Sequence, residues 1–358
     1  MQLTSYRTLG RSGLVVSPLA LGTMTFGTQR WGASDDASRA IFDGYVDAGG
    51  NFIDTADVYA GGRSEELLGG FIAERALRDR LVLATKFTWN VEAGNPNAGG
   101  NGRKNVLRAF DASLRRLRTD HIDLYWLHFW DMVTPVEEVL QTLGDLVRAG
   151  KVRYFALSDV PAWYATKMAV LAGAHGVPGP IAVQTEYSLV ERSAEREHVP
   201  AARECGLGIV PWSPLAGGFL AGKYHRDADR AAVEGRLAGA NPFGDSKFTE
   251  RNWRVLDALR GVAAEAGTTP ARAALAWALG RPGVSSLLIG ASRSEQLHDN
   301  LAALQVALNP AQTRTLDAAS ALDAAFPHSG FTAQIRRAIF GGAAVQGWDG
   351  LQTTGASE

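Results

Sequence analysis

The sequence predicts an α/β protein: a (β/α)8 (TIM) barrel with an N-terminal β-hairpin and long loops over its C-terminal mouth. Short β-like runs alternate with helical patterns along the chain, and successive parallel strands require such helical crossovers. Eight of these runs fall within 358 residues, as in a closed barrel. The rival fold is a doubly wound sheet, but the first strand leads into Gly22-Thr23-Met24-Thr25-Phe26-Gly27 instead of that fold's G-x-G-x-x-G fingerprint.

The expected strands are short apolar runs that follow a hairpin. Tyr6 to Ser17 is typical of such a hairpin, with its turn near Arg11-Ser12-Gly13. A helix is expected after each barrel strand. The eight strands are expected at Leu19–Gly22, Asn51–Asp54, Leu81–Phe87, Ile122–His128, Val152–Ser158, Ile181–Glu186, Leu207–Trp212 and Ser285–Gly290.

Several helices can be predicted from the spacing of apolar residues or from the residues at their start. Apolar residues recur at helical spacing over 107–117 and again over 136–147. The second of these helices is expected to begin with a capping box at Thr134-Pro135-Val136-Glu137, with proline at the first helical position. Thr269-Pro270 is expected to open another helix in the same way.

Two long loops and the C-terminus interrupt this regular pattern. Ala93 to Gly102 is rich in Gly, Asn and Pro, and Tyr224 to Lys247 is polar. Both follow the C-terminal end of a strand, so we expect them to overhang the mouth as lids or substrate walls. Residues 1–340 are expected to form a single domain, and residues 341–358 a flexible tail.

Composition excludes several functional classes. Hydrophobic residues make up 46% of the chain, the net charge is −1, and basic residues form no long block. Nucleic acid and membrane surfaces are therefore not expected partners. The N-terminus lacks the pattern of a signal peptide, and the single cysteine, Cys205, gives neither a disulfide nor a thiol metal cluster. We expect a cytoplasmic protein that acts on a small molecule without a metal, and the oligomeric state cannot be read from the sequence.

Polar residues stand at the C-terminal ends of buried runs. Asp54, Lys86 and His128 each end an expected strand, and Tyr59 follows Asp54 by five residues. A buried polar group without a partner costs roughly 2–7 kcal/mol, so these groups are expected to satisfy one another. Alternation along the strands gives the same conclusion, since the last inward-facing residues would ring the mouth. These ring residues are Asp54, Lys86, His128, Ser158, Gln184 and Trp212.

The four residues suit proton transfer to a carbonyl oxygen. Tyr59 could donate the proton, and an ammonium at Lys86 would lower the pKa of its phenol. Asp54 would serve as the counterion of Lys86, and a neutral His128 could hold the carbonyl oxygen in line with Tyr59. Taken singly, Asp54 could be a helix cap, Tyr59 a packing residue and His128 a core histidine, but a lysine inside a strand rarely stays unpaired.

These four residues, in this order and on these strands, resemble the catalytic tetrad of the aldo-keto reductase family. The resemblance runs from about Tyr6 to Leu304. It implies an NADP(H)-dependent carbonyl reductase and alcohol dehydrogenase, in which Tyr59 is the general acid/base, Lys86 lowers its pKa, Asp54 pairs with Lys86 and His128 orients the substrate. The segment Ser158-Asp159-Val160-Pro161-Ala162-Trp163 resembles aryl-alcohol-dehydrogenase-like members.

The family binds NADPH extended across the barrel mouth, and the resemblance implies where this chain would hold it. Ser158, Asp159 and Gln184 would meet the nicotinamide carboxamide, with Asp159 where the family commonly has asparagine, and Trp212 would stack on the ring. The glycine-rich Ser213–Lys223 would meet the pyrophosphate, and Arg293 the 2′-phosphate, beside a helix capped by Ser292 or Ser294. The expected cofactor residues are Gly22, Thr23, Met24, Ser158, Asp159, Gln184, Trp212, Ser213, Pro214, Leu215, Gly217, Gly218, Lys223, Ile289, Gly290, Ser292, Arg293, Gln296, Asp299 and Asn300.

Two other functions remain open from the sequence, as does the substrate. Lys86 could instead be the nucleophile of a Schiff-base aldolase. The chain could also be an NADPH-binding regulatory module, like the potassium-channel beta subunits that share this fold. Trp31, Trp89 and Trp130 lie near strand ends, where they could wall an apolar substrate pocket or belong to the core.

Overall fold

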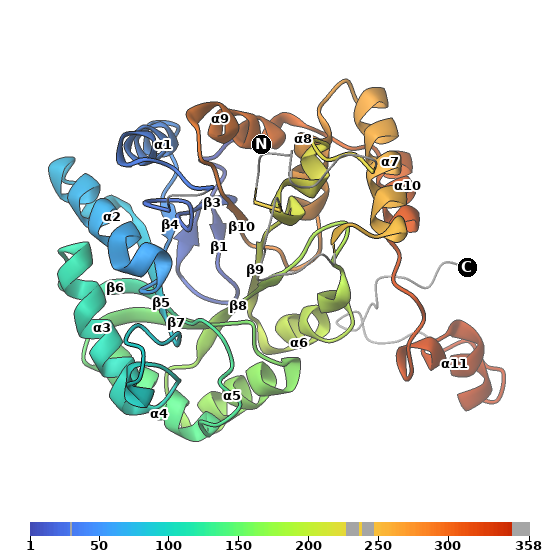
Figure 1. The fold of residues 1–358 in the computed structure, drawn as a ribbon. Helices are drawn as coiled ribbons and strands as arrows, with labels where there is room; N and C mark the ends of the chain where they lie inside the picture. Colours follow the sequence, from blue (N-terminus) through green and yellow to red (C-terminus); the bar gives the residue numbers. More distant parts are fainter. Residues whose placement is uncertain (29–30, 227–235, 238–246, 346–358) are drawn as a thin grey trace.

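The computed structural model describes residues 1–28, 31–226, 236–237 and 247–345, and its centre is one sheet of eight parallel strands (Figure 1). The strand order is β10-β3-β4-β5-β6-β7-β8-β9. The two edge strands meet where Ile209 exchanges backbone hydrogen bonds with Gly283 and Ser285. The sheet is therefore a nearly closed barrel, which confirms the predicted fold. Its strands are β3 (Leu19–Gly22), β4 (Phe52–Asp54), β5 (Val82–Phe87), β6 (Ile122–Leu127), β7 (Val152–Ser158), β8 (Pro180–Glu186), β9 (Gly208–Trp212) and β10 (Leu287–Ile289).

Helices surround the strands in a ring, except for the last helix, which lies apart from the barrel (Figure 1). They are α1 (Asp35–Asp47), α2 (Arg63–Glu74), α3 (Arg103–Leu117), α4 (Val136–Arg148), α5 (Ala162–His175), α6 (His198–Cys205), α7 (Glu250–Glu265), α8 (Pro270–Leu279), α9 (Ser294–Ala302), α10 (Pro310–Ala319) and α11 (Ala333–Ile339). Short 3-10 turns join them at η1 (Tyr59–Gly62), η2 (Arg78–Arg80), η3 (Pro96–Ala98), η4 (Ser193–Glu195), η5 (Ala216–Ala221), η8 (Ala303–Gln305) and η9 (His328–Gly330).

Strand alternation separates two cores, as predicted. Residues that face the barrel interior form a compact cluster that includes Phe52, Ala84 and Trp126. Their neighbours along each strand, such as Ile53 and Tyr125, pack outward against the helices in a second, larger cluster. The inward residues share their parity with the polar groups at the strand ends, so those groups point into the mouth of the barrel.

The predicted hairpin closes the opposite end of the barrel. Strands β1 (Arg7–Thr8) and β2 (Val15–Val16) pair in antiparallel fashion, and Leu9 and Val16 belong to the inner core. The turn approaches the barrel very closely: a Cβ at Gly10, whose φ is +61°, would lie 2.5 Å from backbone atoms of Ile181 and Gly208. Only glycine fits this contact. The close approach allows the hairpin to pack tightly against this end of the barrel.

Helix starts were predicted less accurately than strands. Thr269 caps α8 as expected, accepting the N–H of Arg272 at 3.3 Å. The predicted capping box at Thr134 is wrong. Helix α4 begins only at Val136, and the hydroxyl of Thr134 donates to the carboxylate of Asp131 at 2.6 Å. The N-cap position of α4 is occupied by Pro135, so Thr134 lies one residue before the position from which a hydroxyl accepts the first free N–H groups.

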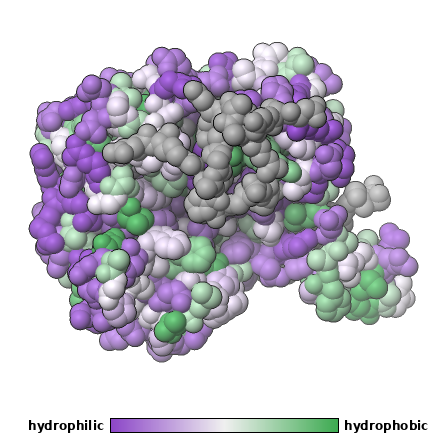
Figure 2. All heavy atoms as spheres, in the orientation of Figure 1, coloured by the Kyte–Doolittle hydropathy of each residue, from purple (hydrophilic) through white to green (hydrophobic). Residues whose placement is uncertain are grey.

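A small lobe at the C-terminal end stands away from the barrel and carries exposed apolar side chains (Figures 1 and 2). It contains α11, and Phe326 and Ile339 are 92% and 71% exposed. The expected tail begins within this lobe, and its residues 346–358 lie outside the described residues. Within the described part of the chain, every helix is too short or too polar to cross a bilayer.

Tyr45 ties the first two barrel strands together, which predicts a loss of stability in Tyr45→Phe. Its fully buried hydroxyl shares its one proton between the carbonyls of Leu19 and Phe52, at 2.8 and 3.0 Å, and accepts the N–H of Phe52 at 3.2 Å. Without the hydroxyl, buried backbone groups lose their partner, so the free energy of unfolding should fall by about 1–3 kcal/mol. Urea denaturation followed by circular dichroism measures this. Tyr6→Phe removes an exposed hydroxyl and should change stability by less than about 0.5 kcal/mol; equal effects of the two variants would contradict the prediction.

Candidate active site

The strand ends carry the polar side chains that the sequence singled out. Lys86, near the end of β5, is fully buried and forms an ion pair with Asp54, the last residue of β4. Its ammonium also donates to the carbonyl of Thr55 at 3.0 Å and to the hydroxyl of Tyr59 at 3.3 Å. His128 follows directly after β6, and its ring stands edge-on to that of Tyr59 with centroids 5.7 Å apart. The structure thus brings together the four residues expected to share a site.

The chain that leads to Tyr59 continues to pair with β5 beyond the end of β4. Beyond β4, the N–H of Asp57 donates to the carbonyl of Lys86 at 3.1 Å, so the chain stays beside β5 until it turns. It then reverses through left-handed backbone at Gly61 and Gly62, with φ of +64° and +97°, where glycine carries no steric cost. Tyr59 stands between this pairing and the turn, where its hydroxyl meets the ammonium of Lys86.

A second buried polar set lies behind this turn, and the sequence analysis missed its centre. Glu65 is fully buried on α2, where its carboxylate accepts from Thr85 at 2.5 Å and Arg116 at 2.6 Å. Asp57 is also buried, and burial and the charge of Glu65 raise its pKa to about 7. The available signal was spacing: Glu65 precedes the buried Leu68 by three residues on the same helix face.

Neighbouring groups stabilise the ion pair of Lys86 and Asp54. Burial lowers the pKa of Lys86, but the charge of Asp54 and the hydrogen bonds to Asp54 and Tyr59 outweigh it and hold that pKa above its usual value. The second carboxylate oxygen of Asp54 accepts from the amide of Gln184 on β8 at 3.2 Å. A buried pair is stable only when its remaining hydrogen-bonding capacity is satisfied, and these contacts supply that. Lys86 therefore remains an ammonium at neutral pH.

Tyr59 and His128 are both neutral in this environment. Burial raises the pKa of Tyr59 and Lys86 opposes this, so the pKa stays above its usual value. The expected lowering by Lys86 is present, but burial exceeds it. Burial and the charge of Lys86 hold the pKa of His128 well below its usual range. Its buried Nδ1 has no partner among the described residues. A buried lone pair without a partner costs less than an unpaired N–H, so the proton belongs on Nε2.

Four of the expected cofactor residues gather beside the tetrad. Ser158 ends β7 and donates to Asp159 at 3.3 Å, while the indole of Trp212, at the end of β9, donates to the other oxygen of Asp159 at 3.0 Å. The N–H of Asp159 donates to the carbonyl of Gln184 at 3.0 Å. These groups therefore form one connected set from three adjacent strands.

The glycine-rich segment after β9 forms a tight cradle. Gly217 and Gly218 have φ of +65° and +91°, and the hydroxyl of Ser213 accepts the N–H of Gly217 at 3.1 Å. A Cβ on Gly218 would lie 2.9 Å from the side chain of Lys223. Burial and the positive charge of Arg293 lower the pKa of Lys223, so two cations are brought within electrostatic reach of each other. The N–H of Gly218 donates to the carbonyl of Leu215 at 2.9 Å, so both glycine N–H groups are engaged within the turn, and the feature that suits a diphosphate is the positive charge of Lys223 and Arg293.

The start of α9 differs from its prediction. Arg293, which is exposed, occupies the N-cap position, and no side chain caps the helix. Neither Ser292 nor Ser294 caps it; the hydroxyl and N–H of Ser292 both donate to the side chain of Gln296, at 3.0 and 2.8 Å. The amide oxygen of Gln296 is the better-placed acceptor and takes the hydroxyl. The first N–H groups of α9 therefore keep their capacity to bind an anion.

Other expected cofactor residues make contacts within the protein. Asn300 is buried and its amide donates to the carbonyl of Gly290 at 3.1 Å, and Asp299 forms an ion pair with Arg272. Thr23 is fully buried, and its N–H and hydroxyl both donate to the carbonyl at the end of β4, at 2.9 and 3.1 Å. These three residues hold the frame of the mouth in position.

The three tryptophans have different surroundings. Trp89 lies beside the tetrad, with its ring centroid 6.2 Å from that of His128 and 5.6 Å from that of Phe129. Trp130 instead packs on Trp163, at the start of α5, with centroids 5.6 Å apart. Trp89 therefore packs beside His128, whereas Trp130 packs against α5.

The loop after β5 is anchored by hydrogen bonds within the protein. In the loop after β5, Asn101 is fully buried, accepts from Thr88 at 2.6 Å and donates to the carbonyl of Phe129 at 3.0 Å. This loop is thus held in place. The segment expected at Tyr224 to Lys247 lies mostly outside the described residues, but Arg236 from it stacks over Trp31 at 5.3 Å.

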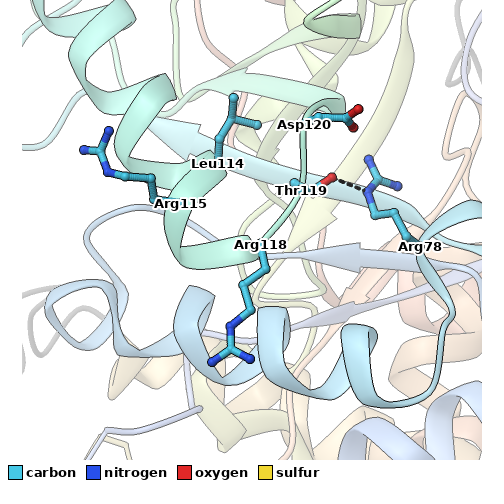
Figure 3. A pocket seen from close by; sticks show the side chains of 6 residues that line it. All are labelled: Arg78, Leu114, Arg115, Arg118, Thr119 and Asp120. Carbon is cyan, nitrogen blue, oxygen red and sulfur yellow. Dashed lines mark hydrogen bonds between the residues drawn. The ribbon is translucent and has the colours of Figure 1, made fainter.

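A surface hollow elsewhere on the molecule does not form a competing site (Figure 3). It lies at turns that precede β5 and β6, at the end of the barrel opposite the mouth. Arg78 is engaged with Thr119, and Arg115 and Arg118 extend in different directions, so the cations do not converge. The lining residues are Arg78, Leu114, Arg115, Arg118, Thr119 and Asp120.

Comparison with known proteins identifies relatives over most of the chain. Residues 18–321 match the sequence model of the aldo/keto reductase family. A norsolorinic acid reductase of Aspergillus flavus is 35% identical over 325 residues, which cover 88% of this chain and 81% of the relative. A putative aryl-alcohol dehydrogenase of Saccharomyces cerevisiae is 33% identical, covering 92% and 90%. A probable voltage-gated potassium channel subunit beta of Oryza sativa is 35% identical, covering 84% and 91%.

The buried ion pair predicts a pH-dependent loss of stability in Lys86→Met. The change leaves Asp54 buried without its cation, so the free energy of unfolding should fall by about 3–5 kcal/mol at neutral pH. The pKa of the unpaired carboxyl would lie above its unfolded value, so proton uptake favours the folded state. The loss should therefore be full at neutral pH and shrink as the pH falls through the raised folded pKa.

Urea unfolding of the variant at several pH values between about 5 and 8 measures this loss, within the range where a raised carboxyl pKa titrates. Lys104→Met, which removes an exposed lysine on α3, is the matched control and should show little change at any pH. A loss in Lys86→Met that does not depend on pH would contradict the prediction.

Proposed function

The chain belongs to the aldo/keto reductase family, and from that membership we propose that it is an NADP(H)-dependent oxidoreductase that interconverts a carbonyl compound and its alcohol. One observation carries the proposal: the hydroxyl of Tyr59 lies 3.3 Å from an ammonium, Lys86, that is itself paired with the buried Asp54. Such an arrangement places a proton donor next to a fixed positive charge.

Tyr59 acts as the general acid in the direction of reduction. Bound nicotinamide supplies the hydride, which adds two electrons to the carbonyl carbon. The oxygen then gains negative charge, and Tyr59 gives it a proton, so that an alcohol results. Because its pKa is raised, Tyr59 holds that proton at neutral pH. The ammonium of Lys86 stabilises the phenolate left behind. In the direction of oxidation Tyr59 accepts the proton, which requires the phenolate.

His128 positions the carbonyl oxygen. Its imidazole is neutral, since its pKa lies well below the usual range, and the orphaned Nδ1 places the hydrogen on Nε2. A neutral N–H can donate to the substrate oxygen beside Tyr59, without competing with Tyr59 as a strong acid. The edge-on contact of the two rings supports this shared target.

The cofactor has a set of residues suited to each of its parts. Trp212, Ser158 and Gln184 lie beside the tetrad and would hold the nicotinamide end. The cradle at Gly217 and Gly218 with Lys223 would hold the diphosphate, and Arg293 with the uncapped start of α9 would hold the 2′-phosphate of NADP. Besides burial, the charge of Arg293 lowers the pKa of Lys223, and an anionic ligand near both would offset this repulsion.

We propose an aromatic aldehyde, ketone or alcohol as the substrate. Trp89 and Phe129 form an aromatic wall beside His128, and both side chains are partly exposed to the mouth loops. Flat aromatic surfaces favour aromatic ligands by offset or edge-on stacking. The names of two relatives, a norsolorinic acid reductase and a putative aryl-alcohol dehydrogenase, agree with this class.

The two alternative functions receive less support. A Schiff-base lysine must be neutral to attack a carbonyl, whereas Lys86 is held as an ammonium by Asp54. The regulatory-module alternative is supported by relatives named as channel subunits. The presence of all four tetrad residues in mutual contact favours turnover, and an assay for NADPH oxidation separates the two.

Removal of the phenol hydroxyl should abolish chemistry while leaving binding intact. In Tyr59→Phe we expect turnover of aromatic aldehydes to fall by about 10²–10⁴-fold, because the general acid is lost. NADPH affinity should change by less than about twofold. The assays are NADPH oxidation at its absorbance band and NADPH fluorescence titration. Tyr6→Phe is the matched control. Full activity in Tyr59→Phe would show that Tyr59 is not the general acid.

The adenosine end predicts a charge-specific effect on nucleotide choice. Arg293→Ala should weaken NADPH binding by about tenfold, since a charge-assisted contact to the 2′-phosphate is lost. NADH binding should not change, because NADH lacks that phosphate. Arg314→Ala, at an exposed position on α10, controls for a general loss of positive charge. Equal weakening of both nucleotides would place Arg293 away from the 2′-phosphate.

A further inference from the structure

Asp159 is fixed where the ends of several strands meet. Its carbonyl accepts the N–H of Trp130, beyond β6, at 3.3 Å, and its N–H donates to the carbonyl of Gln184, on β8. Its backbone adopts a left-handed conformation, with φ of +45°, which costs energy for a residue other than glycine. The carboxylate then reaches the indole of Trp212, on β9, at 3.0 Å. A side chain tied at both backbone and carboxylate has a defined position in the mouth.

The carboxylate of Asp159 differs from the neighbouring carboxylates of Asp54 and Glu186, each of which is paired with a lysine. Asp54 is paired with Lys86, and Glu186 with Lys247. Asp159 instead accepts from two neutral donors, the indole of Trp212 and a hydroxyl. Among the described residues it forms no ion pair. Neutral donors stabilise a carboxylate without cancelling its charge, so a net negative charge stands at this side of the mouth.

That charge is present at neutral pH and acts on the reaction centre. Burial raises the pKa of Asp159 to about 6; the two hydrogen bonds and Lys86 oppose this rise, and the negative charge of Glu186 adds to it. The carboxylate is therefore mostly ionised at pH 7. The mutual influence of Asp159 and Lys86 shows that the charge lies within electrostatic reach of the tetrad.

Resting on the function proposed above, we propose that the Asp159 carboxylate biases this mouth toward the oxidised cofactor. The nicotinamide ring carries a positive charge in NADP⁺ and none in NADPH. In a partly desolvated mouth, a fixed carboxylate stabilises the cationic ring and does little for the neutral one. A neutral amide at this position would lack that discrimination. Asp159 is thus a residue that sets the relative affinity for the two cofactor forms, and with it the balance between alcohol oxidation and carbonyl reduction.

The inference carries a definite proton linkage. A nearby cation lowers the pKa of a carboxyl group, so binding of NADP⁺ should lower the pKa of Asp159 and release part of a proton near pH 6. Binding of NADPH should release none through this group. The preference for NADP⁺ should be full well above pH 6 and should fade as the pH drops below it, because Asp159 then becomes neutral. The charged groups around it are paired with one another, Lys86 with Asp54 and Glu186 with Lys247.

The test compares dissociation constants of both cofactor forms in the unaltered protein and in Asp159→Asn. Asparagine keeps the size and an acceptor for the Trp212 indole but removes the charge. By isothermal titration calorimetry at about pH 7.5, the variant should bind NADP⁺ about tenfold more weakly and NADPH within about twofold. The adenosine fragment 2′,5′-ADP, which lacks nicotinamide, should bind both proteins equally. Asp111→Asn, on the exposed face of α3, should match the unaltered protein for all three ligands.

A second measurement does not depend on the variant. Titrations of the unaltered protein at about pH 6, in buffers with different ionisation enthalpies, should show more proton release with NADP⁺ than with NADPH, since the 2′-phosphate, whose second pKa is about 6, contributes the same release to both forms. Equal NADP⁺-to-NADPH affinity ratios in the two proteins, or equal proton release with both forms, would overturn the inference. If 2′,5′-ADP also failed to bind the unaltered protein, the cofactor assignment itself would fall, and the inference with it.

Discussion

The buried ion pair between Lys86 and Asp54 is the constraint around which the rest of the structure is arranged. Transfer of an ammonium and a carboxylate from water costs several kcal/mol for each ion, and their attraction offsets this only in a fully satisfied geometry. Here β4 and β5 bring the two groups together, Gln184 serves the second carboxylate oxygen, and the carbonyl of Thr55 serves the ammonium. The contacts join β4 and the residue after it with β5 and β8, so the pair is satisfied only when the barrel has formed.

The position of Tyr59 is a consequence of this pair and of the polar set behind it. The backbone that carries Tyr59 is anchored to the carbonyl of Lys86 through Asp57. Behind that turn, Glu65 is locked by Arg116 and by Thr85. Hydroxyl, carboxylate and guanidinium groups at this depth are tolerated only as a connected network. A reaction that moves one proton over a short distance benefits from such a rigid frame, because a small displacement of the donor lowers the rate sharply.

Strand positions and inward-facing residues could be predicted from the sequence to within one or two residues, whereas local hydrogen-bond partners could not. Strand alternation depends only on neighbouring residues, so Phe52 and Ala84 correctly indicated which way Asp54 and Lys86 point. Predicted caps at Thr134 and at Ser292 failed for a common reason. In each case the helix begins one residue later than expected, with Pro135 and Arg293 at the N-cap, and the hydroxyl outside the cap donates to a nearby side chain instead. Trp130 likewise depends on its packing against α5, which no local pattern contains.

The proton and the hydride sides of the proposed reaction are governed by different charges. On the proton side, burial raises the pKa of Tyr59 despite the nearby ammonium, which keeps the donor loaded for reduction. On the cofactor side, the carboxylate of Asp159 has only neutral donors and would favour the cationic ring that reduction leaves behind. Both effects stabilise species on the path of carbonyl reduction at neutral pH, but they respond to pH differently. Loss of the Tyr59 proton requires alkaline conditions, whereas Asp159 becomes neutral near pH 6. Between these limits the mouth holds a protonated acid and an ionised carboxylate at once, which is the state that serves hydride and proton transfer together.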